Sequence, residues 1–261
     1  MKNIYLLCAL LLLFFTPVTT HAQKKLTAHK IARILPRDTI SVKNLQWWDS
    51  SRKRLVPVAI YAPAKVRNAR VVLVSHSYGQ NNMDCYHRYS YLCNYLARKG
   101  YYVVSIQHEL PTDPLLPVAG CTMQTRMSNW ERGAGNIHFV IARLKHDQPQ
   151  LDYKSVTLIG HANGGDISML YAQKCPKDIT KVISLDSRRM PFPRAAYPKV
   201  YAIRSTEQSV DGGVIPTLAE QKKYGIRCVN AHCTQNDMDN TATDNQRKEI
   251  SGYILSFMQA K

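Results

Sequence analysis

The chain has 261 residues, of which 45% are hydrophobic, 20% charged and 9% aromatic, with a net charge of +17. This composition is ordinary for a globular protein and excludes a disordered, collagen-like or minimal disulfide-stabilised chain. The length allows one α/β domain with a sizeable core, whereas two full-sized domains would be cramped.

Residues 1–22 are typical of a secretory signal peptide. Lys2 precedes an apolar run over residues 4–15, and Thr20-His21-Ala22 supplies a small-x-small cleavage site. The run is too short to span a bilayer, and no later segment approaches the ~18 uninterrupted apolar residues of a membrane helix. We therefore expect a secreted or periplasmic chain with no transmembrane segment.

Positive charge is concentrated near the start of the expected mature chain. Residues 24–70 contain 12 Lys or Arg, against only Asp38 and Asp49 as acids. We divide the mature chain into a basic segment, residues 23–44, and a domain, residues 45–261. Residues 24–70 could hold an anionic envelope surface by salt-sensitive attraction, although a solubilising surface is the simpler interpretation. Nucleic acid is not expected as a partner of an exported chain that lacks a recognition motif.

Short β-branched runs follow along the chain and predict the strands of a sheet. Residues 57–61 alternate like an edge strand that pairs with the segment around Trp47 and Trp48. Buried parallel strands are then expected at residues 71–75, 101–106, 156–159, 182–185, 200–203 and 226–229.

Helical patterns lie between these strands. The clearest spans residues 125–145, where Trp130, Ala134, Ile137, Ile141 and Leu144 recur at helical spacing. Other helices are expected to begin near residues 86, 163 and 216, and a further helix is expected at the end of the chain. Strands that alternate with helices predict an α/β fold with a doubly wound, mostly parallel sheet flanked by helices.

Six of the seven cysteines remain after removal of the signal peptide with Cys8: Cys85, Cys93, Cys121, Cys175, Cys228 and Cys233. An even number in an exported chain favours disulfides, with 15 possible pairings of which Cys228 with Cys233 is the first to test. A zinc site at Cys228, His232 and Cys233 lacks a recognisable second half. No metal or other cofactor is expected.

The strongest motif is Gly160-His161-Ala162-Asn163-Gly164, where a predicted strand turns directly into a helix. G-x-S-x-G at such a turn is a nucleophile elbow, whose small neighbours let strand and helix approach closely. In this motif the chain resembles the α/β-hydrolase superfamily, and in particular exported bacterial esterase-like proteins.

Four further segments support the resemblance, in the chain order of that superfamily. Residues 48–63 resemble its leading hairpin, and residues 71–79 its first central strand with the oxyanion loop. Residues 199–214 resemble the strand and loop that carry the catalytic acid, and residues 235–238 the late loop that carries the base.

The resemblance implies a serine, a histidine and a carboxylate, but two of these roles are vacant. Ala162 stands at the nucleophile position and cannot attack a carbonyl, and Gln235 stands at the base position and cannot relay a proton near neutral pH. Loss of the nucleophile alone costs on the order of 10⁶ in turnover. The sequence therefore predicts a catalytically impaired pseudoenzyme that binds a small ester-like or apolar ligand or a partner.

Two alternatives stay open. The chain could be a Ser-to-Ala variant of an active esterase or lipase-like hydrolase that uses His232 as its base, or Ser77 could act as a relocated nucleophile. Glu207 is the first candidate for the acid and Asp211 the second.

The remaining site residues are assigned by their place in the resemblance. The backbone N–H groups of Ser77 or Tyr78 and of Asn163 are expected to form the oxyanion hole. Aromatic and imidazole side chains next to these positions could line a ligand cavity, and the candidates are Tyr78, Tyr86 and His161.

Overall fold

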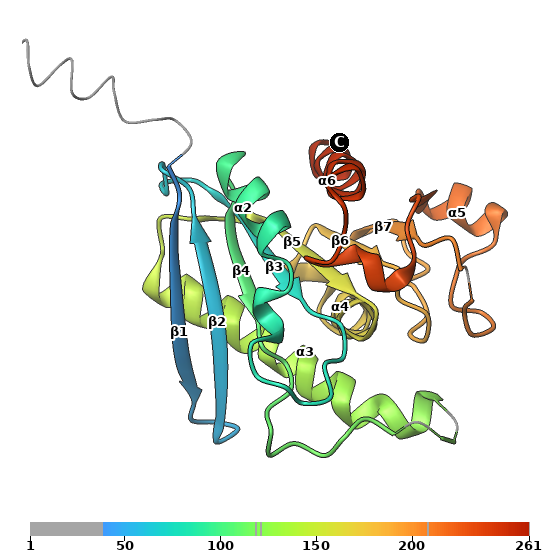
Figure 1. The fold of residues 1–261 in the computed structure, drawn as a ribbon, viewed down its shortest axis with the longest axis horizontal. Helices are drawn as coiled ribbons and strands as arrows, with labels where there is room; N and C mark the ends of the chain where they lie inside the picture. Colours follow the sequence, from blue (N-terminus) through green and yellow to red (C-terminus); the bar gives the residue numbers. More distant parts are fainter. Residues whose placement is uncertain (1–38, 118, 121, 208, 261) are drawn as a thin grey trace, which may run out of the picture. The chain divides into compact units, whose positions relative to one another are not determined.

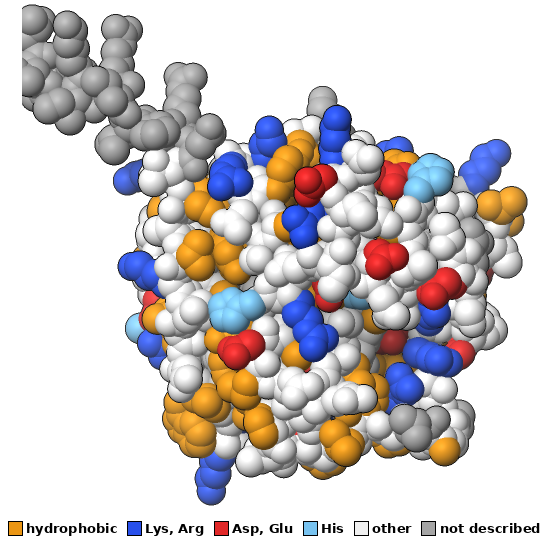
Figure 2. Space-filling view, viewed as in Figure 1, with side chains coloured by type: hydrophobic (Ala, Val, Ile, Leu, Met, Phe, Trp, Pro, Cys, Tyr) orange, Lys and Arg blue, Asp and Glu red, His pale blue; other side chains and the backbone are white. Residues whose placement is uncertain are grey.

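The computed structural model describes residues 39–117, 119–120, 122–207 and 209–260. The expected signal peptide, most of the basic segment and Cys121 lie outside these residues. Among the described helices, none is both long and apolar enough to cross a membrane. On the face shown in Figure 2, Lys and Arg side chains are dispersed among acidic and apolar ones rather than gathered into one patch.

Eight strands form one sheet in the order β1-β2-β4-β3-β5-β6-β7-β8 (Figure 1). They are β1 (Ser41–Asp49), β2 (Arg54–Ala62), β3 (Arg70–Ser75), β4 (Tyr102–Ile106), β5 (Asp152–His161), β6 (Lys181–Leu185), β7 (Lys199–Arg204) and β8 (Arg227–Asn230). β2 pairs antiparallel with β1 and β4, and every other pair is parallel. The doubly wound, mostly parallel sheet predicted from the sequence is confirmed, and its first strand starts at Ser41.

Helices cover both faces of the sheet because its central strands are apolar on both sides. The helices are α2 (Ser90–Arg98), α3 (Thr122–Asp147), α4 (Asn163–Lys174), α5 (Leu218–Tyr224) and α6 (Asp244–Gln259), with 3₁₀ turns η1 (Cys85–His87), η2 (Pro176–Asp178) and η3 (Gln235–Met238). Leu73 and Leu158 pack with α3 and α4, whereas their chain neighbours Val74 and Ile159 pack with α2 and α6 on the opposite face. This alternation is the period of two that a strand imposes.

The predicted helix near residue 86 is divided in the structure. Residues 85–87 form η1, and α2 begins at Ser90, because Tyr89 has φ −113° and ψ 26° and interrupts helical geometry. The break places the Tyr89 side chain in the interior, where it is fully buried beneath the carboxyl ends of the central strands.

The described cysteines are free thiols: Cys85, Cys93, Cys175, Cys228 and Cys233. The predicted disulfide between Cys228 and Cys233 is therefore not formed. The two side chains pack against different faces of the sheet, Cys228 with the cluster under α3 and α4 and Cys233 with the cluster under α2 and α6. Since a disulfide needs facing Cβ atoms, proximity in sequence does not suffice here.

Candidate active site

The elbow between β5 and α4 keeps the shape of a nucleophile turn. Ala162 has φ 47° and ψ −114°, a conformation that costs a residue with a side chain on the order of 1–3 kcal/mol. A Cβ on Gly160 would collide with the backbone of Gly164, and one on Gly164 would collide with the backbone of Ser75 and His76. The motif glycines are thus required by close packing, and the strained turn presents a methyl group.

A buried polar cluster fixes the helix side of the elbow. The Asn163 side-chain oxygen accepts a hydrogen bond from Trp130 Nε1 at 2.8 Å. Its amide nitrogen donates to Glu109 Oε1 at 3.1 Å and to Asn129 Oδ1 at 2.9 Å. All four side chains are buried. The sequence analysis did not find this cluster, because residues 109, 129–130 and 163 meet only through the tertiary fold.

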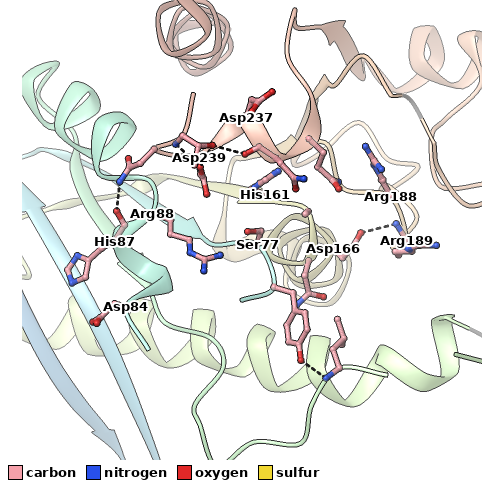
Figure 3. A pocket seen from close by; sticks show the side chains of 18 of the residues that line it. Ser77, Asp84, His87, Arg88, His161, Asp166, Arg188, Arg189, Asp237 and Asp239 are labelled. Carbon is pink, nitrogen blue, oxygen red and sulfur yellow. Dashed lines mark hydrogen bonds between the residues drawn. The ribbon is translucent and has the colours of Figure 1, made fainter. Parts of the chain in front are cut away.

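A cavity of about 970 Å³ opens at the elbow (Figure 3). The structure brings these predicted site residues together in its wall: Ser77, Tyr78, His161, Ala162, Asn163 and Gln235. Charged side chains join them, four arginines and four aspartates: Arg88, Arg126, Arg188, Arg189, Asp84, Asp166, Asp237 and Asp239. The cavity wall therefore offers charged groups that an apolar or simple ester ligand does not require.

Gln235 occupies the first turn of η3 and faces this cavity. Its side-chain amide donates to the backbone carbonyl of Asp186 at 2.8 Å, and its backbone N–H donates to Glu207 Oε2 at 3.3 Å. The amide is thus fixed by the end of β6, and it cannot take a proton from a nucleophile near neutral pH.

His232, the alternative base, is not brought to Ala162. Its side chain is 91% exposed, and Nδ1 lies 2.9 Å from Glu249 Oε1 on α6. The backbone N–H of His232 also donates to Glu249, at 3.0 Å. This pairing turns the ring to the outer side of the loop, away from the cavity lining.

The two acid candidates are both engaged by arginines. Glu207 follows β7 and accepts a hydrogen bond from the Arg188 guanidinium at 2.5 Å. Asp211 pairs with Arg189 at 2.5 Å and is not part of the cavity wall. Glu207 therefore lies beside Gln235, as the resemblance implies, but its carboxylate neutralises a cation instead of orienting a base.

The loop after β3, which the resemblance predicts to supply the oxyanion hole, connects to His161 through Tyr89. The backbone N–H of Ser77 donates to the Tyr89 hydroxyl at 3.3 Å, and that hydroxyl lies 2.5 Å from His161 Nδ1. The Tyr89 oxygen thus accepts from Ser77 and shares a second hydrogen bond with the His161 imidazole, whose tautomer sets the donor. Burial lowers the pKa of His161 to about 4, so the imidazole is neutral at physiological pH.

Of the two tyrosines predicted to bind a ligand, only one lies in the cavity wall. Tyr78 lines the cavity, and its hydroxyl accepts a hydrogen bond from the backbone N–H of Leu116 at 2.9 Å. Tyr86 lies outside the cavity wall, with its ring tilted by 35° against that of His87 and the ring centroids 4.0 Å apart. Tyr89, which is fully buried, is the tyrosine that contacts His161. Helical spacing could not separate Tyr86 from Tyr89, because the predicted helix is interrupted between them.

Asp166 is a further cavity residue that sequence reasoning missed. It lies one turn into α4, where its carboxylate accepts the backbone N–H groups of Arg189 at 3.0 Å and Met190 at 2.9 Å. Burial raises the pKa of Asp166 to about 7. The two hydrogen bonds and the nearby Arg126 and Arg189 act in the opposite direction, but they lower the pKa by less than burial raises it.

Comparisons with known proteins agree with this architecture. No protein-family model and no curated protein matches the chain. Among solved structures, esterase Est22 superposes with a TM-score of 0.65 and 10% identity, covering 94% of this chain and 90% of Est22. A bacterial heroin esterase gives a TM-score of 0.60 and 12% identity, covering 91% of this chain and 89% of its own.

A dienelactone hydrolase-like promiscuous phosphotriesterase, P91, from metagenomic libraries gives a TM-score of 0.60 and 12% identity over 84% of this chain and 97% of its own. These identities establish a shared architecture and not a shared activity. The strand order, the elbow after β5 and these superpositions together show that the chain has the α/β-hydrolase fold of esterase-like proteins.

Proposed function

We propose that this protein is an exported pseudoenzyme that binds a small polar ligand in the cavity at the elbow and does not hydrolyse esters. The observation that carries the proposal is the pair of residues at the two reacting positions. Ala162 holds a strained elbow conformation with no nucleophilic atom, and the Gln235 amide faces the same cavity in place of a base.

Retention of the scaffold supports a binding role. The glycines that allow the tight turn and the Asn163 cluster behind it remain. A strained turn and a large polar cavity both cost stability, and a cavity that binds a ligand can recover that cost. Four arginines and four aspartates in the wall favour a ligand with several hydrogen-bonding groups over an apolar one.

The absence of catalysis is tested by turnover of p-nitrophenyl acetate and labelling by a fluorophosphonate probe. We expect the purified protein to hydrolyse the ester at most about 10³–10⁴-fold faster than the uncatalysed reaction, which is the residual rate of a serine hydrolase without its triad, and to remain unlabelled. Labelling or sustained turnover that maps to any side chain would overturn the pseudoenzyme proposal.

The binding role is tested with a library of small polar fragments observed by ligand-detected NMR. Asn236 is exposed and lines the cavity, so Asn236→Trp places a bulky side chain across it. Asn230 is also exposed but ends β8 outside the cavity wall, which makes Asn230→Trp the matched control. Asn236→Trp should abolish fragment binding, and Asn230→Trp should leave it unchanged. Equal fragment binding by both variants would contradict a ligand site at the elbow.

A further inference from the structure

Three potential metal ligands of different chemistry meet on the side of the domain that α3 and α4 cover. His138 lies on α3, Cys175 directly follows α4, and Asp178 ends η2. One ligand atom from each lies within 4.8 Å of the other two. In the described part of the chain, no other group of three His, Cys, Asp or Glu residues meets this criterion.

The separations approach those of a metal centre. Tetrahedral Zn²⁺, with bonds of roughly 2.0–2.3 Å to nitrogen, oxygen and sulfur, sets its ligand atoms roughly 3.3–3.7 Å apart. His138 Nδ1 lies 3.8 Å from Asp178 Oδ2, too far for a hydrogen bond but close to the separation across such an ion.

Tyr171 positions the carboxylate. Its hydroxyl, on the buried side of α4, donates to Asp178 Oδ2 at 2.7 Å. A hydrogen bond from a neighbouring buried group is the usual way in which proteins orient a metal-binding carboxylate. The adjacent Lys174 ammonium is directed to Glu131 at 3.0 Å, so this cation is paired elsewhere.

We propose that His138, Cys175 and Asp178 form a binding site for Zn²⁺, with water completing the coordination sphere. Imidazole, thiolate and carboxylate together suit Zn²⁺ and its substitute Co²⁺, whereas Ca²⁺ and Mg²⁺ require oxygen ligands throughout. The Cys175 thiol gives its proton to solvent when its sulfur binds the ion. The bound ion ties α3 to the end of α4, the helix that begins at the elbow.

This proposal does not depend on the proposed function. None of the three residues lines the elbow cavity, so ester hydrolysis and fragment binding there are measured separately. A failure of the metal site leaves the pseudoenzyme proposal unchanged, and the reverse also holds.

The test uses full-length protein without a histidine tag, freed of metal under reducing conditions. Competition with a chromophoric chelator should give one Zn²⁺ per chain with a Kd at or below the micromolar range. Cys175→Ser should weaken binding at least about tenfold, because it removes one of three ligands. Cys228 is also a half-buried free cysteine, so Cys228→Ser is the matched control and should bind as the wild type does.

Co²⁺ provides an independent spectroscopic readout. The wild type should show a thiolate-to-cobalt charge-transfer band that Cys175→Ser loses and Cys228→Ser keeps. His138 is 67% exposed, so His138→Gln should stay folded and still weaken Zn²⁺ binding, with His146→Gln, at an 85% exposed position, as its control. The proposal would be overturned if the wild type bound no stoichiometric Zn²⁺, or if Cys175→Ser and His138→Gln bound Zn²⁺ as tightly as the wild type does.

Discussion

The Gln235 side-chain amide, in the wall of the elbow cavity, donates a hydrogen bond to the backbone carbonyl of Asp186, 2.8 Å away. Gln235, which stands where the resemblance places the histidine base, therefore helps to hold the loop in its conformation. Glu207, the neighbouring acid candidate, is likewise committed to Arg188. A single engineered Ser-to-Ala change would leave these surroundings arranged for a histidine. Their arrangement around an amide instead favours loss of the whole triad.

Restoration of the triad should require more than a serine. We expect Ala162→Ser to raise kcat/KM for p-nitrophenyl acetate by less than about tenfold, because no base faces the new hydroxyl. Ala162→Ser with Gln235→His should gain about 10²-fold or more over either single variant, the usual contribution of a positioned general base. The gain stays below that of a full triad while Arg188 holds Glu207.

Active-site labelling with a fluorophosphonate is the check on the origin of any activity. The label should map to residue 162 in the double variant alone. Strong recovery by Ala162→Ser without Gln235→His would show that another residue already acts as the base, and would revive the interpretation of this chain as an inactivated enzyme.

The close packing at the elbow predicts a large effect of one methyl group. Gly164→Ala should cost at least about 3 kcal/mol of unfolding free energy, because the added Cβ overlaps the backbone of Ser75 and His76 and neither can move without shifting β3. Gly252→Ala, in α6, is the matched control: nothing lies within 4 Å of its Cβ, and it should gain about 0.5–1 kcal/mol from helix propensity. Urea unfolding measures both, and similar midpoints would contradict the packing argument.

Much of the architecture follows from the sequence because it depends on local patterns. β-branched runs predict the central strands, apolar spacing predicts α3, and the glycine pattern locates the elbow. The contacts of single side chains are harder to predict. Cys228 and Cys233 lie five positions apart, yet they face opposite sides of the sheet.

Loop orientation and long-range contacts account for the other differences. Residues 232 and 235 lie in one short loop, and the sequence alone does not show which faces the elbow; the acceptor on α6, Glu249, turns His232 outward. The contact of Tyr89 with His161 joins residues 72 positions apart, so no spacing rule indicates it. Such contacts depend on how the helices pack against the sheet, and the hydrophobic periodicity of the sequence does not determine this packing.

A buried ion cluster under the acid loop predicts a second stability effect. Asp186 is fully buried and accepts hydrogen bonds from Arg188 and Ser205, and it pairs with Arg204 at 2.8 Å. Asp186→Asn tolerates the left-handed φ of 50° but removes the charge, leaving the buried Arg204 guanidinium without a carboxylate. We expect a loss of about 3–5 kcal/mol.

The control for this cluster is an ion pair of similar length in a more exposed place. Asp211 pairs with Arg189 at 2.5 Å with both side chains more than one third exposed. Asp211→Asn should therefore cost at most about 1 kcal/mol. Denaturant unfolding at neutral pH distinguishes the two, and equal losses would mean that burial does not govern these pairs.

The Asp166 carboxyl predicts how stability changes with pH. Burial raises its pKa to about 7 in the folded chain, against ~3.9 in an unfolded chain, so the folded state retains a proton over this interval that the unfolded state releases. The contribution of Asp166 is thus fully present below about pH 4 and is lost as the pH rises through about 7. The loss amounts to at most about 4 kcal/mol, since each pKa unit corresponds to about 1.4 kcal/mol.

Comparison of the wild type with Asp166→Asn isolates this effect. His161, whose pKa is lowered to about 4, makes the folded state less stable as the pH falls through 6.5 to 4, but it is present in both proteins and cancels in the difference. Urea unfolding between pH 4 and 8 should show the wild type losing stability relative to Asp166→Asn as the pH rises. A difference that stays constant over this range would show that the Asp166 carboxyl is already ionised inside the fold, and the cavity would then carry one more negative charge opposite Arg126 and Arg189.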